Sequence, residues 1–299
     1  MAFLEMKHVT KRFKSVVAND DVCLSVEKGE VHALLGENGA GKSTLMNILY
    51  GMYDQSEGEI YLHGKKVQIN DTKQAIELGI GMVHQHFMLI PALTVIENVI
   101  LGLKENNLIL DLNSAAEKFK EMAKKYSMEI DPWTRVENLS VGQQQRLEIL
   151  KALYRNADLL ILDEPTAVLT PQEVVSLFDM VRKLTSEGKT VIFISHKLAE
   201  IMEICDRCTV LRQGKVAATV DVKDVRNKED LATLMVGKNV ELVTQKKEVT
   251  AGEEILRVEN LCADNHDNRP VLIDVSFSLR AGEILGICGV DGNGQSEMV

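Results

Sequence analysis

Residues 36–43 read Gly36-Glu37-Asn38-Gly39-Ala40-Gly41-Lys42-Ser43, and Thr44 follows. They match the pattern G-x-x-x-x-G-K-[ST], in which glycines allow backbone N–H groups to surround phosphate oxygens. In this pattern Lys42 reaches the β- and γ-phosphates of a nucleotide, and the hydroxyl of Ser43 binds Mg²⁺. The positive end of the following helix adds to the attraction. The stretch therefore predicts a site for a nucleotide and Mg²⁺.

The segments on either side of this loop have the context that the motif requires. Residues 31–35 are apolar and predict a buried strand. Apolar residues at helical spacing follow the loop and predict a helix: Leu45, Ile48 and Leu49. A glycine-rich loop can also be a purely structural turn. The strand before residues 36–43 and the helix after them favour a phosphate loop over such a turn.

Strands and helices alternate along the first two thirds of the chain. Residues 3–9 and 22–26 alternate apolar and polar positions, as half-buried strands do. The pattern is helical from 87 to about 155, and strand signals return at 159–162 and 191–194. This alternation predicts a parallel α/β sheet with an inserted helical block.

Two capping boxes mark expected helix starts. Ser114 and Glu117 have the spacing of a capping box in the helical block. Thr170, Pro171 and Glu173 predict the start of the helix between the strands at 159–162 and 191–194.

Two carboxylates, Asp163 and Glu164, end the apolar run at 159–162. Neighbouring side chains on a strand point to opposite faces, so the two carboxylates are expected to have different roles. Downstream of a phosphate loop, Asp163 is expected to hold the Mg²⁺ shell. Glu164 is then expected to polarise the attacking water as a general base. A solvated strand end has the same local pattern, and the preceding phosphate loop favours the catalytic interpretation.

Residues 139–146 read Leu139-Ser140-Val141-Gly142-Gln143-Gln144-Gln145-Arg146. Taken alone, this is a helix start with a serine N-cap. The order of phosphate loop, LSVGQQQ, LLILDEP and Ser195-His196, however, resembles the ATP-binding cassette (ABC) ATPases. In that family the LSGGQ signature contacts the γ-phosphate bound to the opposite subunit, and the resemblance implies this role for Ser140, Gly142 and Gln143.

The resemblance also implies a fold and further site residues. The implied fold is an α/β P-loop NTPase core of ABC type, with an antiparallel β subdomain and an α-helical subdomain inserted at about 87–155. Gln85 resembles the Q-loop glutamine, which contacts Mg²⁺ and the attacking water, and His196 resembles the switch histidine, which contacts the γ-phosphate. Phe13 falls where the family has an aromatic residue that stacks on adenine, and a core phenylalanine is the alternative there.

The sequence departs from the family pattern at three positions. Val141 stands in the signature where glycine is usual, and Thr170 stands where the loop after Glu164 usually ends in aspartate. In a second glycine-rich loop near the C-terminus, Gln295 replaces the lysine.

The C-terminal part of the chain repeats the N-terminal part. Residues 255–261 resemble 3–9, and 274–289 resemble 21–36 at an offset of 253 residues. A repeat of this kind indicates a second copy of the domain. The expected organisation is a first ABC domain, a charge-rich linker and the beginning of an incomplete second ABC domain, over 1–237, 238–254 and 255–299.

Composition excludes several classes of function. Apolar residues make up 45% and charged residues 26%, as in ordinary globular proteins. The formal net charge of −10 disfavours non-specific binding to nucleic acid or anionic lipid. No uncharged apolar run approaches the roughly 18 residues of a membrane helix, and the N-terminus lacks the apolar core of a secretory signal. We therefore expect a cytoplasmic protein.

Cys205 and Cys208 form a C-x-x-C pair, a spacing used in zinc sites and redox pairs. The sequence has no second C-x-x-C or H-x-x-x-H to complete a zinc site. The pair falls between a helical pattern at 197–204 and a strand pattern at 209–212, so we expect buried thiols without such a role.

The lysine-free second loop narrows the resemblance to the two-cassette ATPase subunits of bacterial importers for simple sugars and nucleosides. Residues 81–102 most resemble the nucleoside-uptake branch. The alternatives are an importer ATPase for ribose- or galactose-type sugars, an inactive nucleotide-binding fragment, and a soluble translation-associated ABC protein. The short linker and the acidic charge disfavour the last of these.

The resemblance implies ATP and Mg²⁺ as cofactors and no nucleic-acid partner. The implied partners are a second ABC cassette, in the same chain or by homodimerisation, and membrane permease subunits that hold the ATPase at the inner face of the cell membrane. A substrate-binding lipoprotein or periplasmic protein is an indirect partner. With a second cassette that lacks its own signature, the chain alone is expected to hydrolyse ATP slowly.

Overall fold

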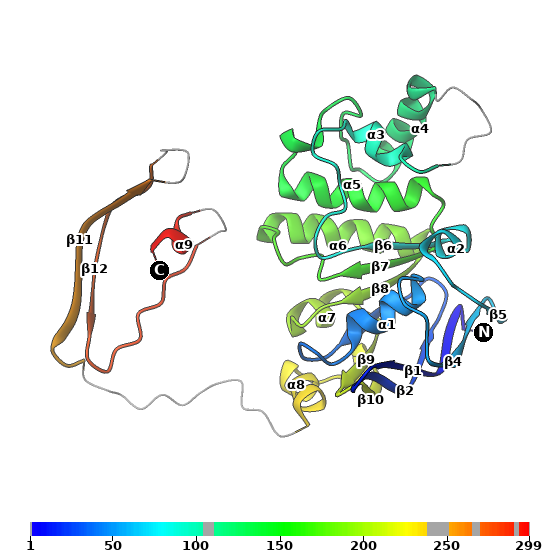
Figure 1. Cartoon of the computed structure of the whole chain (residues 1–299), viewed down its shortest axis with the longest axis horizontal. Coiled ribbons are helices and arrows are strands. Elements are labelled where there is room, and N and C mark those ends of the chain that lie inside the picture. Colours follow the sequence, from blue (N-terminus) through cyan, green and yellow to red (C-terminus); the bar gives the residue numbers. More distant parts are fainter. Residues whose placement is uncertain (1, 104–110, 238–250, 265–269, 290–292, 299) are drawn as a thin grey trace. The chain divides into compact units, whose positions relative to one another are not determined.

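The computed structural model describes residues 2–103, 111–237, 251–264, 270–289 and 293–298 (Figure 1). The chain divides into two compact units, Met1–Val240 and Glu241–Val299. Among the described helices, none combines the length and the apolar character needed to cross a membrane.

A six-stranded sheet forms the centre of the first unit. Its strands lie in the order β10-β9-β3-β8-β7-β6, and all pair in parallel except β10 with β9. Because neighbouring parallel strands end at the same edge, the residues that follow β3, β6, β7 and β8 come together there. The strands are β3 (Val31–Leu35), β6 (Ile80–Val83), β7 (Leu159–Asp163), β8 (Thr190–Ile194), β9 (Arg207–Arg212) and β10 (Lys215–Asp221).

A second, antiparallel sheet packs against one face of the central sheet. It has the order β2-β1-β4-β5, from β1 (Leu4–Phe13), β2 (Val16–Val26), β4 (Glu57–Leu62) and β5 (Lys65–Val67). β1 and β2 extend beyond the predicted ranges 3–9 and 22–26. The hairpin β4–β5 was not predicted from the sequence. His63 and Gly64 at its turn both have positive φ, as type I′ hairpin turns require.

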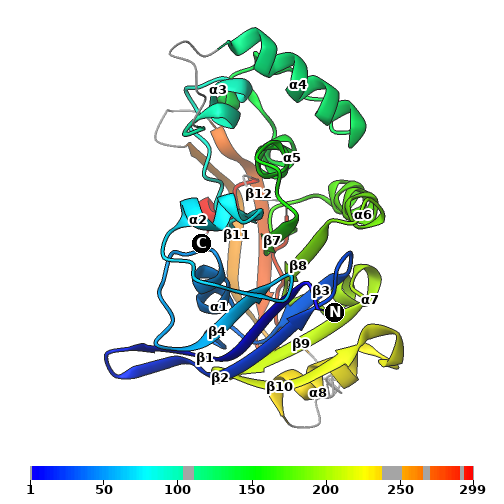
Figure 2. The same ribbon diagram turned by 90° about the vertical axis from the view of Figure 1, so that its right-hand side faces the viewer.

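Alternate side chains of the central sheet enter two separate cores. Leu34, Ile161 and Ile192 belong to the core shared with α1 and the antiparallel sheet. Leu35 and Phe193 belong to the core shared with the helices on the other face. Figure 2 shows α1 on one side of the sheet and α6 and α7 on the other.

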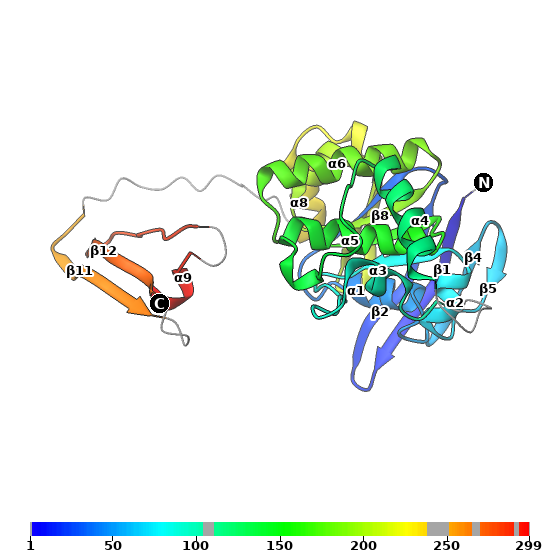
Figure 3. The same ribbon diagram turned by 90° about the horizontal axis from the view of Figure 1, so that it is seen from above.

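The helices of the first unit follow the predicted blocks. α5 and α6 run alongside each other, as Figures 1 and 3 both show. The helices are α1 (Lys42–Leu49), α2 (Thr72–Glu77), α3 (Val95–Ile100), α4 (Leu112–Lys125), α5 (Val141–Tyr154), α6 (Pro171–Ser186), α7 (Leu198–Ile204) and α8 (Lys228–Val236), with short 3₁₀ turns at Val136–Asn138 and Val222–Asp224.

The structure confirms one predicted capping box and corrects the other. Thr170 caps α6 in a capping box with Glu173. The prediction for Ser114 and Glu117 was wrong, because α4 begins three residues earlier than expected, at Leu112, and Asp111 is its N-cap. The Asp111 carboxylate accepts the N–H groups of Asn113 and Ser114, so Ser114 already lies inside the first turn.

The second unit is built on a hairpin of β11 (Glu254–Asp264) and β12 (Pro270–Arg280), and α9 (Gln295–Met298) follows. β11 includes Glu254, which the sequence analysis had assigned to the linker. The rest of that expected linker, apart from 251–253, lies outside the described residues.

The hairpin β11–β12 reproduces a distortion of the hairpin β1–β2. His8 and Asp21 have φ of 52° and 56°, and Asn260 and Asp274 have the same two values. In each pair the side chains are hydrogen-bonded to each other across the strands. Asn260 corresponds to His8 at an offset of 252 residues, whereas Asp274 corresponds to Asp21 at an offset of 253 residues. The repeat therefore has one additional residue between these two positions. The repeat is therefore structural as well as sequential.

Candidate functional site

The phosphate loop lies between β3 and α1, as the motif predicts. Gly41 has φ of 100°, and a Cβ atom there would lie 2.4 Å from the carbonyl oxygen of Ala18. Only glycine tolerates both conditions. Lys42 is 7% exposed, and its Nζ donates to the carbonyl oxygens of Gly36 at 2.7 Å and Glu37 at 3.0 Å. The ammonium group therefore lies inside the loop.

The loop faces the end of β7. Burial lowers the pKa of Lys42, while the carboxylates of Glu164 and Asp163 act in the opposite direction. Burial raises the pKa of Asp163, and the neighbouring Glu164 raises it further, whereas a hydrogen bond with Ser43 and the charge of Lys42 lower it. The structure thus brings together a cation, a hydroxyl and two carboxylates from segments about 120 residues apart in the sequence.

These groups fit the Mg²⁺ that the motif implies. Ser43, Asp163 and Gln85 offer a hydroxyl, a carboxylate and an amide oxygen, the hard ligands that Mg²⁺ prefers. Over the described parts of the chain, no three His, Cys, Asp or Glu side chains gather as a metal site. Mg²⁺ usually takes its remaining ligands from substrate phosphates and water, so one carboxylate is sufficient.

Glu164 stands between Gln85 and His196. Gln85 Nε2 donates to Glu164 Oε2 at 3.3 Å, and His196 Nδ1 lies 2.9 Å from Glu164 Oε1. Gln85 follows β6, Glu164 follows β7 and His196 follows β8, so the parallel strand order produces this meeting. Glu164 has φ of 47°, a left-handed conformation that costs a non-glycine residue about 1–3 kcal/mol.

A cavity of about 570 Å³ opens in front of these groups. Part of its lining was not predicted from the sequence, namely residues 16–18 at the start of β2 and the turn Gln213–Gly214 between β9 and β10. The lining residues are Val16, Val17, Ala18, Asn38, Gly39, Gly41, Lys42, Ser43, Thr44, Gln85, Asp163, Glu164, Gln213 and Gly214. Gln213 and Gly214 both have positive φ, and the Gln-Gly pair between two strand patterns was the sequence signal that could have indicated this turn.

Phe13 is not among the described residues that line this cavity. Its ring is 39% exposed and makes an edge contact with Tyr53, at 5.4 Å between centroids. Lys11 Nζ lies 5.0 Å from the centre of the Phe13 ring. Phe13 is thus at the surface and outside the core, and its stacking on adenine stays a prediction.

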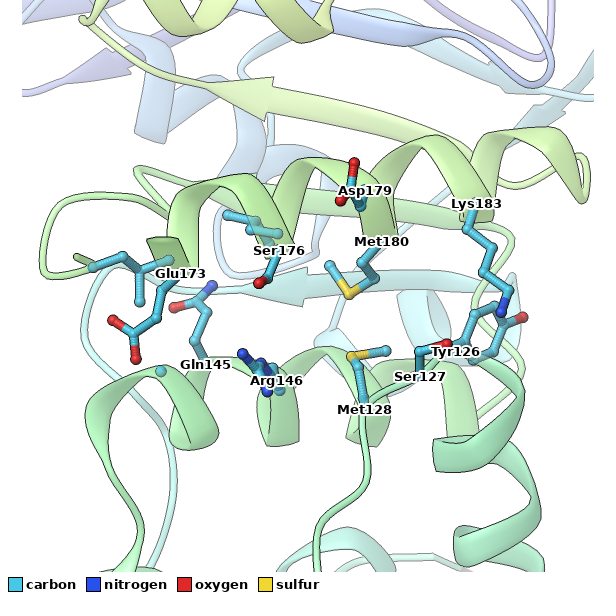
Figure 4. A pocket seen from close by; sticks show the side chains of 13 residues that line it. Tyr126, Ser127, Met128, Gln145, Arg146, Glu173, Ser176, Asp179, Met180 and Lys183 are labelled. Atoms are coloured by element: carbon cyan, nitrogen blue, oxygen red, sulfur yellow. The ribbon is translucent and has the colours of Figure 1, made fainter. Parts of the chain in front are cut away.

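The segment 140–143 forms the start of α5. Ser140 caps the helix in a capping box with Gln143, and none of Ser140, Gly142 and Gln143 is among the described residues that line the phosphate cavity. A Cβ atom on Gly142 would lie 2.0 Å from Oε1 of Glu173. Figure 4 shows Glu173 reaching from α6 toward α5 at one end of a cavity of about 270 Å³ between the two helices. Gly142 therefore permits the close packing of α5 on the first turn of α6.

The two cysteines of the C-x-x-C pair are buried, as expected. Cys205 is 8% exposed and Cys208 is 0% exposed. Burial raises the pKa of Cys208 to about 12 and that of Cys205 well above its usual range.

Comparison with known proteins agrees with this geometry. A family model described as "ABC transporter" matches residues 19–167. Solved structures of ABC transporter cassettes superpose on the chain. The dimeric cassette MJ0796 has a TM-score of 0.65 at 30% identity, over 74% of this chain and 100% of its own. The ADP form of the cassette MJ1267 has a TM-score of 0.70 at 26% identity, over 80% and 100%.

Curated relatives match nearly the whole chain. The nucleoside import ATP-binding protein NupA of Lactococcus lactis subsp. cremoris and the guanosine import ATP-binding protein NupO of Bacillus subtilis are each 50% identical over 99% of this chain. The glucose import ATP-binding protein TsgD13 of Haloferax volcanii is 48% identical over 99%. The chain spans 58–59% of the length of these relatives.

Proposed function

The chain belongs to the ABC transporter family, and from this premise we propose that it is the ATP-hydrolysing subunit of an importer, with nucleosides as the favoured class of solute. The observation that carries the proposal is the position of Glu164. Its carboxylate lies between Gln85 and His196 and lines the same cavity as the phosphate loop.

In the proposed reaction Lys42 holds the β- and γ-phosphates of ATP, and Ser43, Asp163 and Gln85 hold Mg²⁺. When bound, Mg²⁺ neutralises charge on the phosphates. Glu164 accepts a proton from the attacking water as general base. His196 orients that carboxylate from one side and Gln85 from the other, and His196 also reaches the γ-phosphate.

A second cassette would complete the site. Ser140, Gly142 and Gln143 lie at an N-terminal helix end, where backbone N–H groups and the helix dipole favour an anion. They do not line the cavity of their own phosphate loop within the described residues. We propose that they serve the γ-phosphate bound to the facing cassette, in a head-to-tail, two-fold pair.

A groove beside α5 is the proposed contact with a membrane permease. It has a volume of about 320 Å³ and includes Met52, His84 and Met88 in its lining. Met52 and Met88 are 46% and 58% exposed. Exposed methionines suit an apolar helix of a partner, because they adapt to its shape.

The groove is joined to the phosphate site through the loop after Gln85. The backbone N–H of Met88 donates to Glu148 Oε1 at 2.7 Å, and its carbonyl accepts from Lys151 Nζ at 3.0 Å. Both partners lie on α5, which begins with the signature residues. A permease that moved Met88 would therefore act on both Gln85 and α5. Through such a permease the subunit would lie at the inner face of the membrane and serve a substrate-binding lipoprotein or periplasmic protein indirectly.

The choice of nucleosides is supported by the segment 81–102 and by the 50% identity to the two relatives named for nucleoside and guanosine import. The 48% identity to the relative named for glucose import supports sugars as the second candidate. Uptake of radiolabelled guanosine, uridine, adenosine, ribose and glucose in a strain lacking the gene tests the choice. Loss of nucleoside uptake alone is the expected result, and loss of sugar uptake alone would favour the second candidate.

ATP hydrolysis is tested with the purified chain and MgATP. If two copies pair head to tail, the rate per chain rises with protein concentration, and Ser140→Arg suppresses it. Binding of MgATP without any hydrolysis at high concentration would instead support the alternative of an inactive nucleotide-binding fragment.

A further inference from the structure

Glu200, on α7, is a buried carboxylate behind the groups that surround Glu164. It is 8% exposed, and each of its two carboxylate oxygens accepts one buried hydroxyl group. Thr166 Oγ1 donates to Oε1 at 2.6 Å, and Ser195 Oγ donates to Oε2 at 3.0 Å. The hydroxyl-bearing residues Thr166 and Ser195 are 3% and 2% exposed.

These two hydroxyls belong to the two turns that carry the reacting groups. Thr166 lies two residues after Glu164, and Ser195 immediately precedes His196. Lys197 closes the cluster, because its backbone N–H donates to Ser195 Oγ at 3.0 Å and its Nζ donates to the carbonyl oxygen of Thr166 at 3.1 Å. Lys197 Nζ also lies 3.2 Å from Glu200 Oε1 and supplies the charge that a buried carboxylate needs.

The Glu164 turn requires such support. Glu164 has φ of 47°, and a strained backbone persists only where surrounding contacts over-determine it. Its backbone N–H donates to the carbonyl oxygen of Ile194 at 3.0 Å, which ties the same two turns together on the strand side. Glu200 ties them together on the helix side.

We infer that Glu200 is a positioning residue, which joins the turn after β7 to the turn after β8 and so sets the placement of Glu164 against His196. Glu200 is not among the described residues that line the phosphate cavity. It acts through the hydroxyls of Thr166 and Ser195. Because a displacement of about 1 Å can cost on the order of a hundredfold in rate, loss of this tie should reduce turnover more than binding.

The inference rests on the proposed ATP hydrolysis, and variants of Glu200 test it. Glu200→Ala removes both acceptors, whereas Glu200→Gln keeps one acceptor and the side-chain volume. We expect Glu200→Ala to lower kcat for ATP about tenfold or more with little change in KM, and Glu200→Gln to keep at least about a third of the parent rate. Glu203→Ala is the matched control, since Glu203 is exposed on the same helix and lies outside the cluster, and it should keep the parent rate.

A double-mutant cycle separates positioning from a loss of stability. If Glu200 acts through His196, adding Glu200→Ala to His196→Ala should lower kcat by less than about twofold. If the two substitutions instead lower kcat by the product of their separate factors, the inference is overturned. A kcat of Glu200→Ala equal to that of the parent would overturn it as well. If Glu200→Ala does not fold, Ser195→Ala and Thr166→Val replace it in this test, because each removes one of the two hydroxyl groups that donate to Glu200.

Hydrogen exchange gives a readout that does not depend on hydrolysis. The amide of Glu164 should exchange faster in Glu200→Ala than in Glu200→Gln or Glu203→Ala, and the change should be confined to 163–167 and 194–200. If the parent chain hydrolyses no ATP but this pattern appears, the proposed function fails and the positioning role stands. Unchanged exchange in Glu200→Ala would contradict the positioning role itself.

Discussion

The Nδ1 atom of His196 lies 2.9 Å from Oε1 of Glu164, although the two residues follow different strands. The side chain of Glu164 is 16% exposed and that of His196 is 49% exposed, so the carboxylate is largely covered while the histidine still faces solvent. This arrangement leaves the second carboxylate oxygen of Glu164 to Gln85.

Replacing Glu164 with glutamine should abolish turnover and keep MgATP binding. Glutamine retains the shape and one acceptor oxygen but cannot accept the proton from water, so kcat should fall by about 10²–10⁴-fold. A fluorescent ATP analogue measures binding, and phosphate release measures turnover. His196→Ala should also slow hydrolysis while nucleotide affinity stays nearly unchanged. Turnover of Glu164→Gln at the parent rate would show that another group is the base.

Lys42→Ala should strongly weaken MgATP binding. Charge-assisted hydrogen bonds are worth about 1.5–3 kcal/mol, which corresponds to roughly a ten- to hundredfold loss of affinity. Isothermal titration calorimetry measures the effect. Lys73→Ala is the control, because Lys73 is exposed on α2, where it pairs with Glu77 at 3.9 Å. Equal affinities for both variants would remove Lys42 from the phosphate site.

Gly142→Ala should destabilise the first unit. The new methyl group would push Glu173 away, and Thr170 would lose its capping partner, at a cost of about 1–2 kcal/mol. Thermal unfolding should show a Tm lower by several degrees. Val141→Ala is the neighbouring control, since Val141 is 44% exposed. In a Glu173→Ala background, Gly142→Ala should lower the Tm little further. If it lowers the Tm there as much as in the parent, this explanation is contradicted.

Asp163→Asn should raise stability at neutral pH. The pKa of Asp163 is raised in the folded state, mainly by burial, so the folded protein is penalised wherever this carboxyl is ionised. The gain should be present at pH 7 and should shrink as pH falls toward 4, where the parent carboxyl becomes protonated in both states. Urea unfolding between pH 4.5 and 8 measures it, with the exposed Asp54→Asn as control. A gain that does not depend on pH would point to packing instead.

Cys205 and Cys208 should resist alkylation in the native protein. The pKa of Cys208 is about 12, so thiolate is scarce below pH 11, and Cys205 is shifted in the same direction. Iodoacetamide at pH 8 should modify Cys23, Cys262 and Cys288, which are exposed. Mass spectrometry counts the labels before and after unfolding, and rapid native labelling of Cys208 would contradict its burial.

Local features of this protein were determined by the sequence alone. The phosphate loop, the N-cap at Ser140, the capping box at Thr170 and the apolar strand before Asp163 depend on residues within one turn or one strand of each other. Such contacts have the same geometry wherever they occur, so the residue pattern is sufficient to predict them. Ser114 is the exception, because Asp111, three residues upstream, caps the helix first and accepts the N–H of Ser114 itself.

Only the tertiary structure decided which distant groups meet. Gln85 and His196 both contact Glu164 because β6, β7 and β8 are neighbours in the sheet, and no local pattern encodes that order. For the same reason the sequence did not point to residues 16–18 or to the turn at Gln213, which line the cavity. Glu200 shows the limit most clearly. On the sequence it is an ordinary helical glutamate, and only the packing of α7 beneath two strand ends buries it between Thr166 and Ser195.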